Sequence, residues 1–116
     1  YSAAHVSPEN DAFKAKLKEL YPDAEPNPAT VSAFDGTHAL YQMIGATGGK
    51  KDPDAAIAAI KGASWESPRG PISIDAGTRD IVQNVYIRKV EKDADGRLFN
   101  REYKTYETQP DYGVQK

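Results

Sequence analysis

The first apolar pattern in the chain has the spacing of a surface helix. Large apolar side chains recur three and four residues apart, with lysines between them, at Phe13, Leu17, Leu20 and Tyr21. This periodicity is typical of a helix that buries one face. Ser7 and Pro8 mark its start, because a serine oxygen accepts a free backbone N–H at the cap and proline has none to satisfy there. The pattern predicts an amphipathic helix that ends at Tyr21-Pro22.

A second pattern, over residues 28–45, is apolar on nearly every side. Asn27-Pro28 marks its start, and Asp35 is its only charged residue. A helix of this kind is normally buried on several sides, and a chain of 116 residues has little else to cover it. We therefore expect a partner segment or a sheet from outside this chain. Asp52-Pro53 begins a third, shorter helix that ends near Lys61.

The last part of the chain has the alternation and the turn residues of strands. It contains a turn at residues 68–71, a short strand at 72–74, and longer strands at 81–91 and 98–106. Asp95-Gly96, between the two longer strands, favours a tight antiparallel hairpin. We expect tyrosine and phenylalanine side chains to stack across one face of this hairpin.

The order of these elements, helices first and strands last, leaves the chain without a complete βαβ unit. The apolar helix needs a sheet to pack against, and this chain does not supply a complete one. The pattern therefore favours a C-terminal fragment of an α/β protein over a self-sufficient domain. Residues 1–107 are expected to form that portion, three helices followed by a β-hairpin, and residues 108–116 a polar tail. The opening at Tyr1, without a methionine or an apolar leader, also favours a fragment.

Composition excludes several classes of function. Basic and acidic residues number 15 and 17, so the net charge of −2 provides no basic surface for nucleic acid. The absence of cysteine excludes disulfides, thiolate metal sites and a cysteine nucleophile. No apolar run approaches the roughly 18 residues that a membrane helix requires.

Candidate catalytic residues do not form a recognisable constellation. His5 and His38 lie on different elements without the spacing of metal ligands, and the serines beside Trp65 do not form a nucleophile elbow. We therefore expect no enzyme activity, no cofactor and no metal. Asp35 is the carboxylate of most interest. A buried acid needs a partner, so Asp35 is either structural, satisfied by backbone or by an arginine, or near a pocket.

An ordered set of motifs covers nearly the whole chain. The motifs are Ser7–Phe13 (SPENDAF), Pro26–Pro28, Ala33–Gly36 (AFDG) at the start of the long helix, Asp52-Pro53, Ser67–Pro71 (SPRGP) and Thr78–Ile87. In this order they resemble the C-terminal third of a type I periplasmic solute-binding protein, of the branched-chain amino acid class that serves ABC importers. The family usually has tyrosine where Phe34 stands, so this chain lacks the phenol hydroxyl there.

The resemblance implies two Rossmann-like lobes, joined by crossing strands, that close on a ligand without catalysis. It implies a periplasmic protein that delivers an amino acid or a small organic or aromatic acid to a transporter permease. The rest of the parent chain, or another copy, would complete the lobes. In such proteins the segment before the first helix and the start of the long helix face the cleft. The ligand-binding candidates are therefore Tyr1, His5, Phe34 and Asp35.

Each candidate suits a different part of a ligand. Phe34 offers a flat apolar wall, and Tyr1 and His5 can donate hydrogen bonds to a carboxylate. Asp35 can accept an ammonium or hold the start of the helix in place.

Two other functions stay open at this stage. The same fold also serves as a ligand-sensing regulatory domain. A free-standing interaction domain would instead use the aromatic side chains of the hairpin, Tyr86, Phe99, Tyr103 and Tyr106. A leader and two α/β lobes upstream in the gene would favour the binding protein over the free-standing domain.

Overall fold

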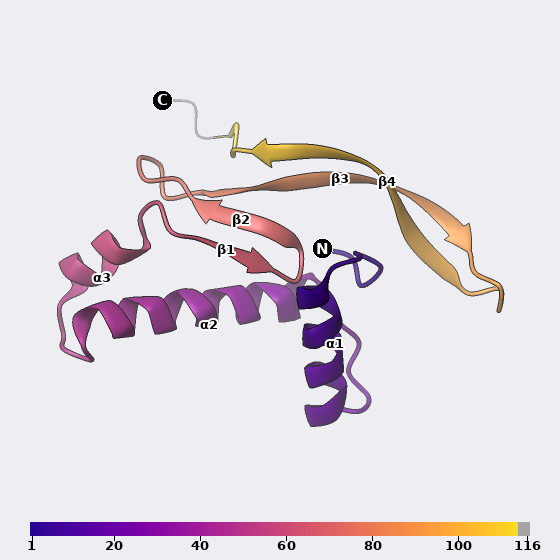
Figure 1. Cartoon of the computed structure of the whole chain (residues 1–116), viewed down its shortest axis with the longest axis horizontal. Helices are drawn as coiled ribbons and strands as arrows, with labels where there is room; N and C mark the ends of the chain where they lie inside the picture. The colour runs from indigo at the N-terminus through magenta and orange to yellow at the C-terminus, as the bar shows by residue number, and fades with distance from the viewer. Residues whose placement is uncertain (114–116) are drawn as a thin grey trace.

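Three helices precede a four-stranded antiparallel sheet in the computed structural model, which describes residues 1–113 (Figure 1). The helices are α1 (Pro8–Leu20), α2 (Pro28–Thr47) and α3 (Pro53–Ile60). The strands, in their spatial order across the sheet, are β1 (Ser64–Ser67), β2 (Gly70–Ile74), β3 (Ile81–Lys92) and β4 (Leu98–Gln109).

The three predicted helix starts are confirmed, each by a side-chain cap. Ser7, Asn27 and Asp52 each accept a hydrogen bond from a backbone N–H in the first turn of α1, α2 and α3, respectively. These bonds satisfy donors that the helix itself leaves free. Helix α2 continues to Thr47, two residues beyond the predicted end, and stops at Gly48, whose φ of 57° lies in the left-handed region. Glycine adopts that conformation without steric cost.

The sequence pattern does not predict β1. Its four residues carry Trp65 as their one large apolar side chain, so no alternation marks them as a strand. The segment becomes a strand because its backbone pairs antiparallel with β2, where Trp65 stands opposite Ile72. The turn expected at residues 68–71 is correspondingly shorter, since Gly70 already begins β2.

Strands β3 and β4 form the predicted antiparallel hairpin, a long twisted ribbon that extends past the other two strands (Figure 1). Gly96 in its turn has a φ of 76°, and the Asp93 carboxylate accepts hydrogen bonds from two backbone N–H groups of the turn. The expected stacking of aromatic side chains across the ribbon is wrong. Tyr86 stands opposite Thr105 and its ring contacts His5 instead.

The end of the hairpin differs from the expected boundary. Strand β4 continues to Gln109, three residues beyond the predicted end and into the segment expected to be a polar tail. Residues 114–116 of that tail lie outside the described residues.

The apolar core of the described chain is small. Phe13, Val31, Ile60 and Ile72 are its buried apolar side chains. Helix α2 lies beneath β1 and β2, with α1 crossing near its N-terminal end (Figure 1). The elements thus meet where residues 1–5, the start of α2 and the turn between β1 and β2 come together.

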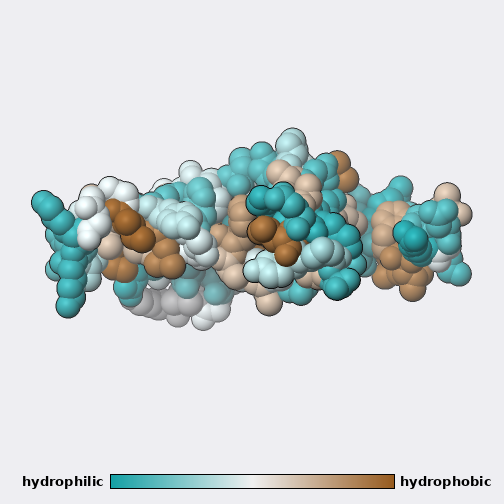
Figure 2. Space-filling view, turned by 90° about the horizontal axis from the view of Figure 1, so that it is seen from below, coloured by the Kyte–Doolittle hydropathy of each residue, from teal (hydrophilic) through white to brown (hydrophobic). Residues whose placement is uncertain are grey.

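Helix α2 leaves much of its apolar surface uncovered in this chain. Leu40, Tyr41 and Ile44 are 54%, 70% and 54% exposed. Figure 2, which views the molecule from the helix side, shows apolar patches on an otherwise hydrophilic surface. Exposed apolar surface of this kind is normally covered by another part of a protein or by a partner, as the apolar pattern of α2 predicts.

Candidate functional site

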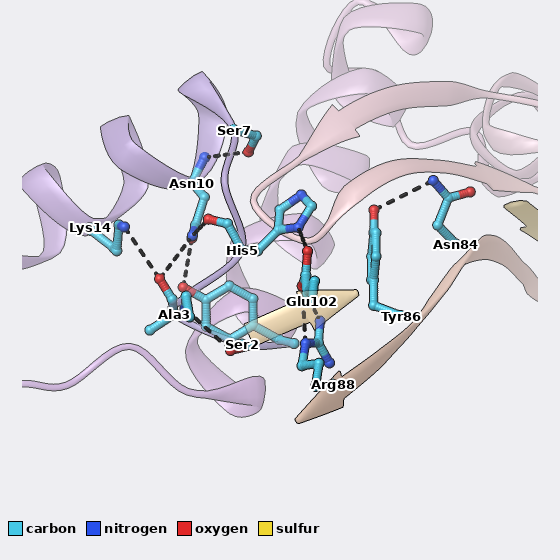
Figure 3. A network of polar contacts seen from close by, with 12 residues as sticks. Ser2, Ala3, His5, Ser7, Asn10, Lys14, Asn84, Tyr86, Arg88 and Glu102 are labelled. Atoms are coloured by element: carbon cyan, nitrogen blue, oxygen red, sulfur yellow. Dashed lines mark hydrogen bonds and ion pairs between the residues drawn. The ribbon is translucent and has the colours of Figure 1, made fainter. Parts of the chain in front are cut away.

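Asn10 fastens the N-terminal segment, residues 1–5, to the start of α1. Its side chain is fully buried and donates hydrogen bonds to the carbonyl oxygens of Ala3 and His5, at 3.2 and 2.6 Å (Figure 3). The Tyr1 hydroxyl donates to Asn10 Oδ1 at 2.7 Å. The Ser7 cap orients this asparagine, because the Ser7 oxygen accepts the Asn10 backbone N–H. The segment is therefore fixed by local sequence at the first turn of α1.

His5 links the same segment to the β3–β4 ribbon. His5 Nδ1 lies 2.8 Å from Glu102 Oε2, and the other carboxylate oxygen accepts hydrogen bonds from Arg88 Nε and Nη2, at 3.0 and 2.7 Å (Figure 3). The imidazole is buried and packs on the Tyr86 ring with 4.8 Å between ring centres. Glu102 thus joins one residue of the N-terminal segment to one residue of β3.

Tyr86 lies directly against the backbone of Gly70. Gly70 has a φ of +96°, and a Cβ at this position would lie 2.0 Å from the Tyr86 hydroxyl oxygen. Arg88 covers the same tyrosine, with its guanidinium carbon 5.3 Å from the ring centre. Burial raises the pKa of the Tyr86 hydroxyl. Gly70 therefore allows a side chain of β3 to approach the turn between β1 and β2.

The carboxylate of Asp35 is buried and fully engaged. It accepts a hydrogen bond from Ser67 Oγ at 2.9 Å and one from Trp65 Nε1 at 3.3 Å, and it pairs with Arg69 Nη2 at 2.9 Å. Of the readings open from the sequence, satisfaction by an arginine is the arrangement observed. The ion pair holds Arg69, in the turn between β1 and β2, against the first turns of α2.

Phe34 lies half exposed in an apolar groove between α1 and α2. The Phe13 ring bridges it to Tyr1, with ring centres 5.3 Å apart between Phe13 and Phe34 and 6.3 Å apart between Tyr1 and Phe13. The groove is open, has a volume of about 520 Å³, and is also lined by His38 and Tyr41. Such a surface suits apolar or aromatic contacts.

A smaller and more polar hollow lies at the other side of Tyr1. It has a volume of about 180 Å³ and is lined by Tyr1, Arg69, Gln83, Asn84, Val85, Tyr86 and Arg88; we call it the arginine pocket. Arg69 and Arg88 bring two positive charges to this pocket, and no carboxylate is among the residues that line it. Guanidinium donors suit a carboxylate.

The structure brings the four sequence-predicted residues to this junction in different roles. Tyr1 lines the arginine pocket, and Phe34 lines the apolar groove beyond Phe13. His5 packs against Tyr86, and Asp35 holds Arg69, so both lie behind the pocket wall.

Sequence reasoning missed the two arginines and Glu102. Arg69 was visible as part of the SPRGP motif, and its unusual place between two prolines and a glycine was the one available signal. No sequence signal marks Arg88 or Glu102, because each lies among several other charged residues in its strand. Over residues 1–113, no group of three or more metal-ligating side chains gathers and no helix has the length and apolar character to cross a membrane.

Known proteins resemble this chain over nearly all of its length. The family model described as "Periplasmic binding protein" matches residues 1–96. The Leu/Ile/Val-binding protein homolog 6 of Brucella abortus (strain 2308) is 47% identical over 115 residues, which cover 98% of this chain and 30% of that protein.

Two solved structures are similar in both sequence and fold. The solute binding protein of an ABC transporter from Rhodopseudomonas palustris HaA2, in complex with p-hydroxybenzoic acid, is 52% identical with a TM-score of 0.90, over 98% of this chain and 31% of that one. Its counterpart from strain BisB5, in complex with 3,4-dihydroxybenzoic acid, is 50% identical with a TM-score of 0.91, over 99% and 31%. The chain thus spans about 30% of the length of these relatives.

Proposed function

Because the chain belongs to the periplasmic binding protein family, we propose that it is the C-terminal part of the solute-binding component of an ABC transporter. That component captures an amino acid or a small organic or aromatic acid between two lobes. The observation that supports this most directly is 50–52% identity, over 98–99% of the chain, to two solute-binding proteins that hold hydroxybenzoic acids. The three helices and the antiparallel sheet make up about a third of the type I fold of these relatives. The relatives are binding proteins and not enzymes.

The proposed ligand cleft includes Tyr1, His5, Phe34 and Asp35. Phe34 is 47% exposed at the start of α2 and provides a flat apolar wall. Covering its exposed half is worth roughly 0.7–1.4 kcal/mol, and stacking on an aromatic ligand adds roughly 0.5–1.5 kcal/mol. Tyr1 faces the arginine pocket. His5 and Asp35 keep Tyr86 and Arg69 in place behind it.

Calorimetry on the full-length protein that contains this chain tests the proposal. We expect binding of 4-hydroxybenzoate, 3,4-dihydroxybenzoate or a branched-chain amino acid, weakened at least tenfold in Phe34→Ala and His5→Ala variants that fold normally. A tenfold loss corresponds to about 1.4 kcal/mol. Tyr21→Ala is the matched control, because Tyr21 is 63% exposed at the far end of α1. Unchanged affinity in both cleft variants would remove these residues from the site.

The uncovered surface of α2 supports a place inside a larger protein. We propose that the rest of the parent chain covers it, and that the isolated segment self-associates through it, because apolar surface left in water is unfavourable. Sedimentation of the isolated segment at micromolar concentration tests this. A monomer that unfolds cooperatively at high dilution would contradict it.

The location and the partner follow from the same proposal. We expect the full-length protein in the periplasm, which cell fractionation measures. We also expect uptake of its ligand to depend on a transporter permease, which an uptake assay in a permease deletion strain measures. Uptake that persists without the permease would favour a ligand-sensing regulatory domain. A free-standing interaction domain is not favoured, because in the relatives the matching segment is about 30% of a longer chain.

A further inference from the structure

Resting on the proposed function, we propose that the arginine pocket binds the carboxylate of an aromatic acid that carries no amino group, and that an α-amino acid is not its ligand. The pocket is lined by Arg69 and Arg88 together with Tyr1 and Tyr86. The residues that line it include no carboxylate. The balance of charged groups around these two arginines decides between the two ligand classes.

Both arginines retain free donors after their ion pairs are formed. Arg69 uses Nη2 for Asp35, and Arg88 uses Nε and Nη2 for Glu102. A guanidinium has five N–H groups in a fork that matches a carboxylate. The side chains of Arg69 and Arg88 are 19% and 22% exposed, so neither is sealed from a ligand. The pocket therefore offers charge-assisted donors to a second anion.

The two carboxylates that pair with these arginines, the buried Asp35 and the partly buried Glu102, are unavailable to a ligand ammonium. Asp35 accepts donors from Arg69, Ser67 and Trp65, so each of its oxygens has a partner inside the chain. Glu102 is held in the same way by His5 and Arg88. Glu66 also acts on the Tyr86 hydroxyl through its charge, but it is exposed and does not line the pocket. An ammonium placed here would lose water without gaining an anion, which is strongly unfavourable.

The two tyrosines that line the pocket are held in fixed positions. Tyr86 is held between Gly70, His5 and the Arg88 guanidinium, and Tyr1 is held by its hydroxyl bond to Asn10. Aromatic rings pack favourably on such fixed rings. The acids present in the two solved relatives, p-hydroxybenzoic and 3,4-dihydroxybenzoic acid, have a carboxylate and an aromatic ring and no amino group.

Calorimetry on the full-length protein with four solutes tests this inference. The solutes are 4-hydroxybenzoate, its uncharged analogue 4-hydroxybenzamide, L-4-hydroxyphenylglycine and L-leucine. We expect 4-hydroxybenzoate to bind at least tenfold more tightly than each of the other three. Binding of either amino acid within threefold of 4-hydroxybenzoate would overturn the inference and leave the proposed function intact. Absence of binding by all four would overturn both.

A ligand-by-variant cycle assigns the carboxylate to the pocket. Arg88→Gln is expected to weaken 4-hydroxybenzoate binding about tenfold to a hundredfold, the range for a charge-assisted contact, and to change 4-hydroxybenzamide binding less than threefold. Arg97→Gln, in the exposed hairpin turn, is the matched control and changes neither. Equal losses for the acid and the amide in Arg88→Gln would overturn the inference, because they would indicate a purely structural arginine. The comparison of ligands on the unmodified protein stands even if a variant does not fold.

Discussion

Gly70→Ala is the substitution with the largest predicted effect on the junction. The added Cβ would lie 2.0 Å from the Tyr86 hydroxyl oxygen and 3.2 Å from its ring carbon Cζ. Tyr86 is not free to move away, because His5 packs on one side of its ring and the Arg88 guanidinium lies over it. The glycine also has a φ of +96°, a conformation that side chains strain.

Two contributions add to the cost of this substitution. Backbone strain at a positive φ costs roughly 1–3 kcal/mol, and overpacking against Tyr86 costs roughly 1–3 kcal/mol more. The sum of roughly 2–6 kcal/mol is large compared with a total stability of about 5–15 kcal/mol. Gly96→Ala separates the two, because Gly96 has a φ of +76° with nothing within 4 Å of its Cβ position. It should show the backbone contribution alone.

Urea unfolding of the full-length protein, followed by circular dichroism, measures these costs. We expect Gly70→Ala to destabilise more than Gly96→Ala, and Tyr86→Phe to recover part of the difference, because it removes the closest atom and leaves Cζ at 3.2 Å. If Gly70→Ala costs no more than Gly96→Ala, the close approach of Tyr86 to this backbone does not limit the position.

Three further predictions concern single polar groups. Asn10→Ala should lower the free energy of unfolding by roughly 2–3 kcal/mol, because it leaves buried partners unsatisfied, and it should speed amide hydrogen exchange in the N-terminal segment. Unchanged exchange rates would show that Asn10 does not hold this segment in place. Asp35→Ala leaves the guanidinium of Arg69 without its partner and should lower the free energy of unfolding in urea by roughly 3–5 kcal/mol. Asp35→Asn should lower it less, and equal losses in the two variants would contradict this expectation. Hydrogen bonds from two backbone N–H groups of its own turn lower the pKa of the exposed Asp75 carboxyl. The ionised Asp75 therefore stabilises the folded protein above the unfolded-state pKa, and this stabilisation is lost as the pH falls through the folded-state pKa. Asp75→Asn should therefore flatten the acid side of the stability profile, and a profile identical to the parent's would show that this turn does not contribute.

Local signals made the helices and the hairpin predictable from the sequence. Each helix start depends on a cap residue and a proline within a few positions, and the ribbon turn depends on Gly96. Strand β1 was not predictable, because it becomes a strand by pairing with β2 and not through its own composition. Propensity is a weak guide where partner strands decide the outcome.

The candidate site depends on contacts between distant residues, which explains why the sequence identified only part of it. Asp35 stands out in the sequence as the one charged residue of an apolar helix, and Phe34 is a candidate through the resemblance to the binding-protein family. The partner of Asp35 was not, because Arg69 lies 34 positions away and approaches only when β1 and β2 form. Glu102 is likewise one of many charged residues on β4 until the fold places it beside His5.

The contact between His5 and Glu102 also has a consequence for the order in which the protein matures at the ribosome. The two residues are separated by 97 positions. At a synthesis rate of roughly 5–20 residues per second, the glutamate follows the histidine by roughly 5–20 s. Contacts across so much chain close late and slowly, because the entropy of the intervening loop must be lost first. His5 therefore waits for the last strand to gain its carboxylate partner, and a nascent chain cut short before Glu102 holds the N-terminal segment through Asn10 alone.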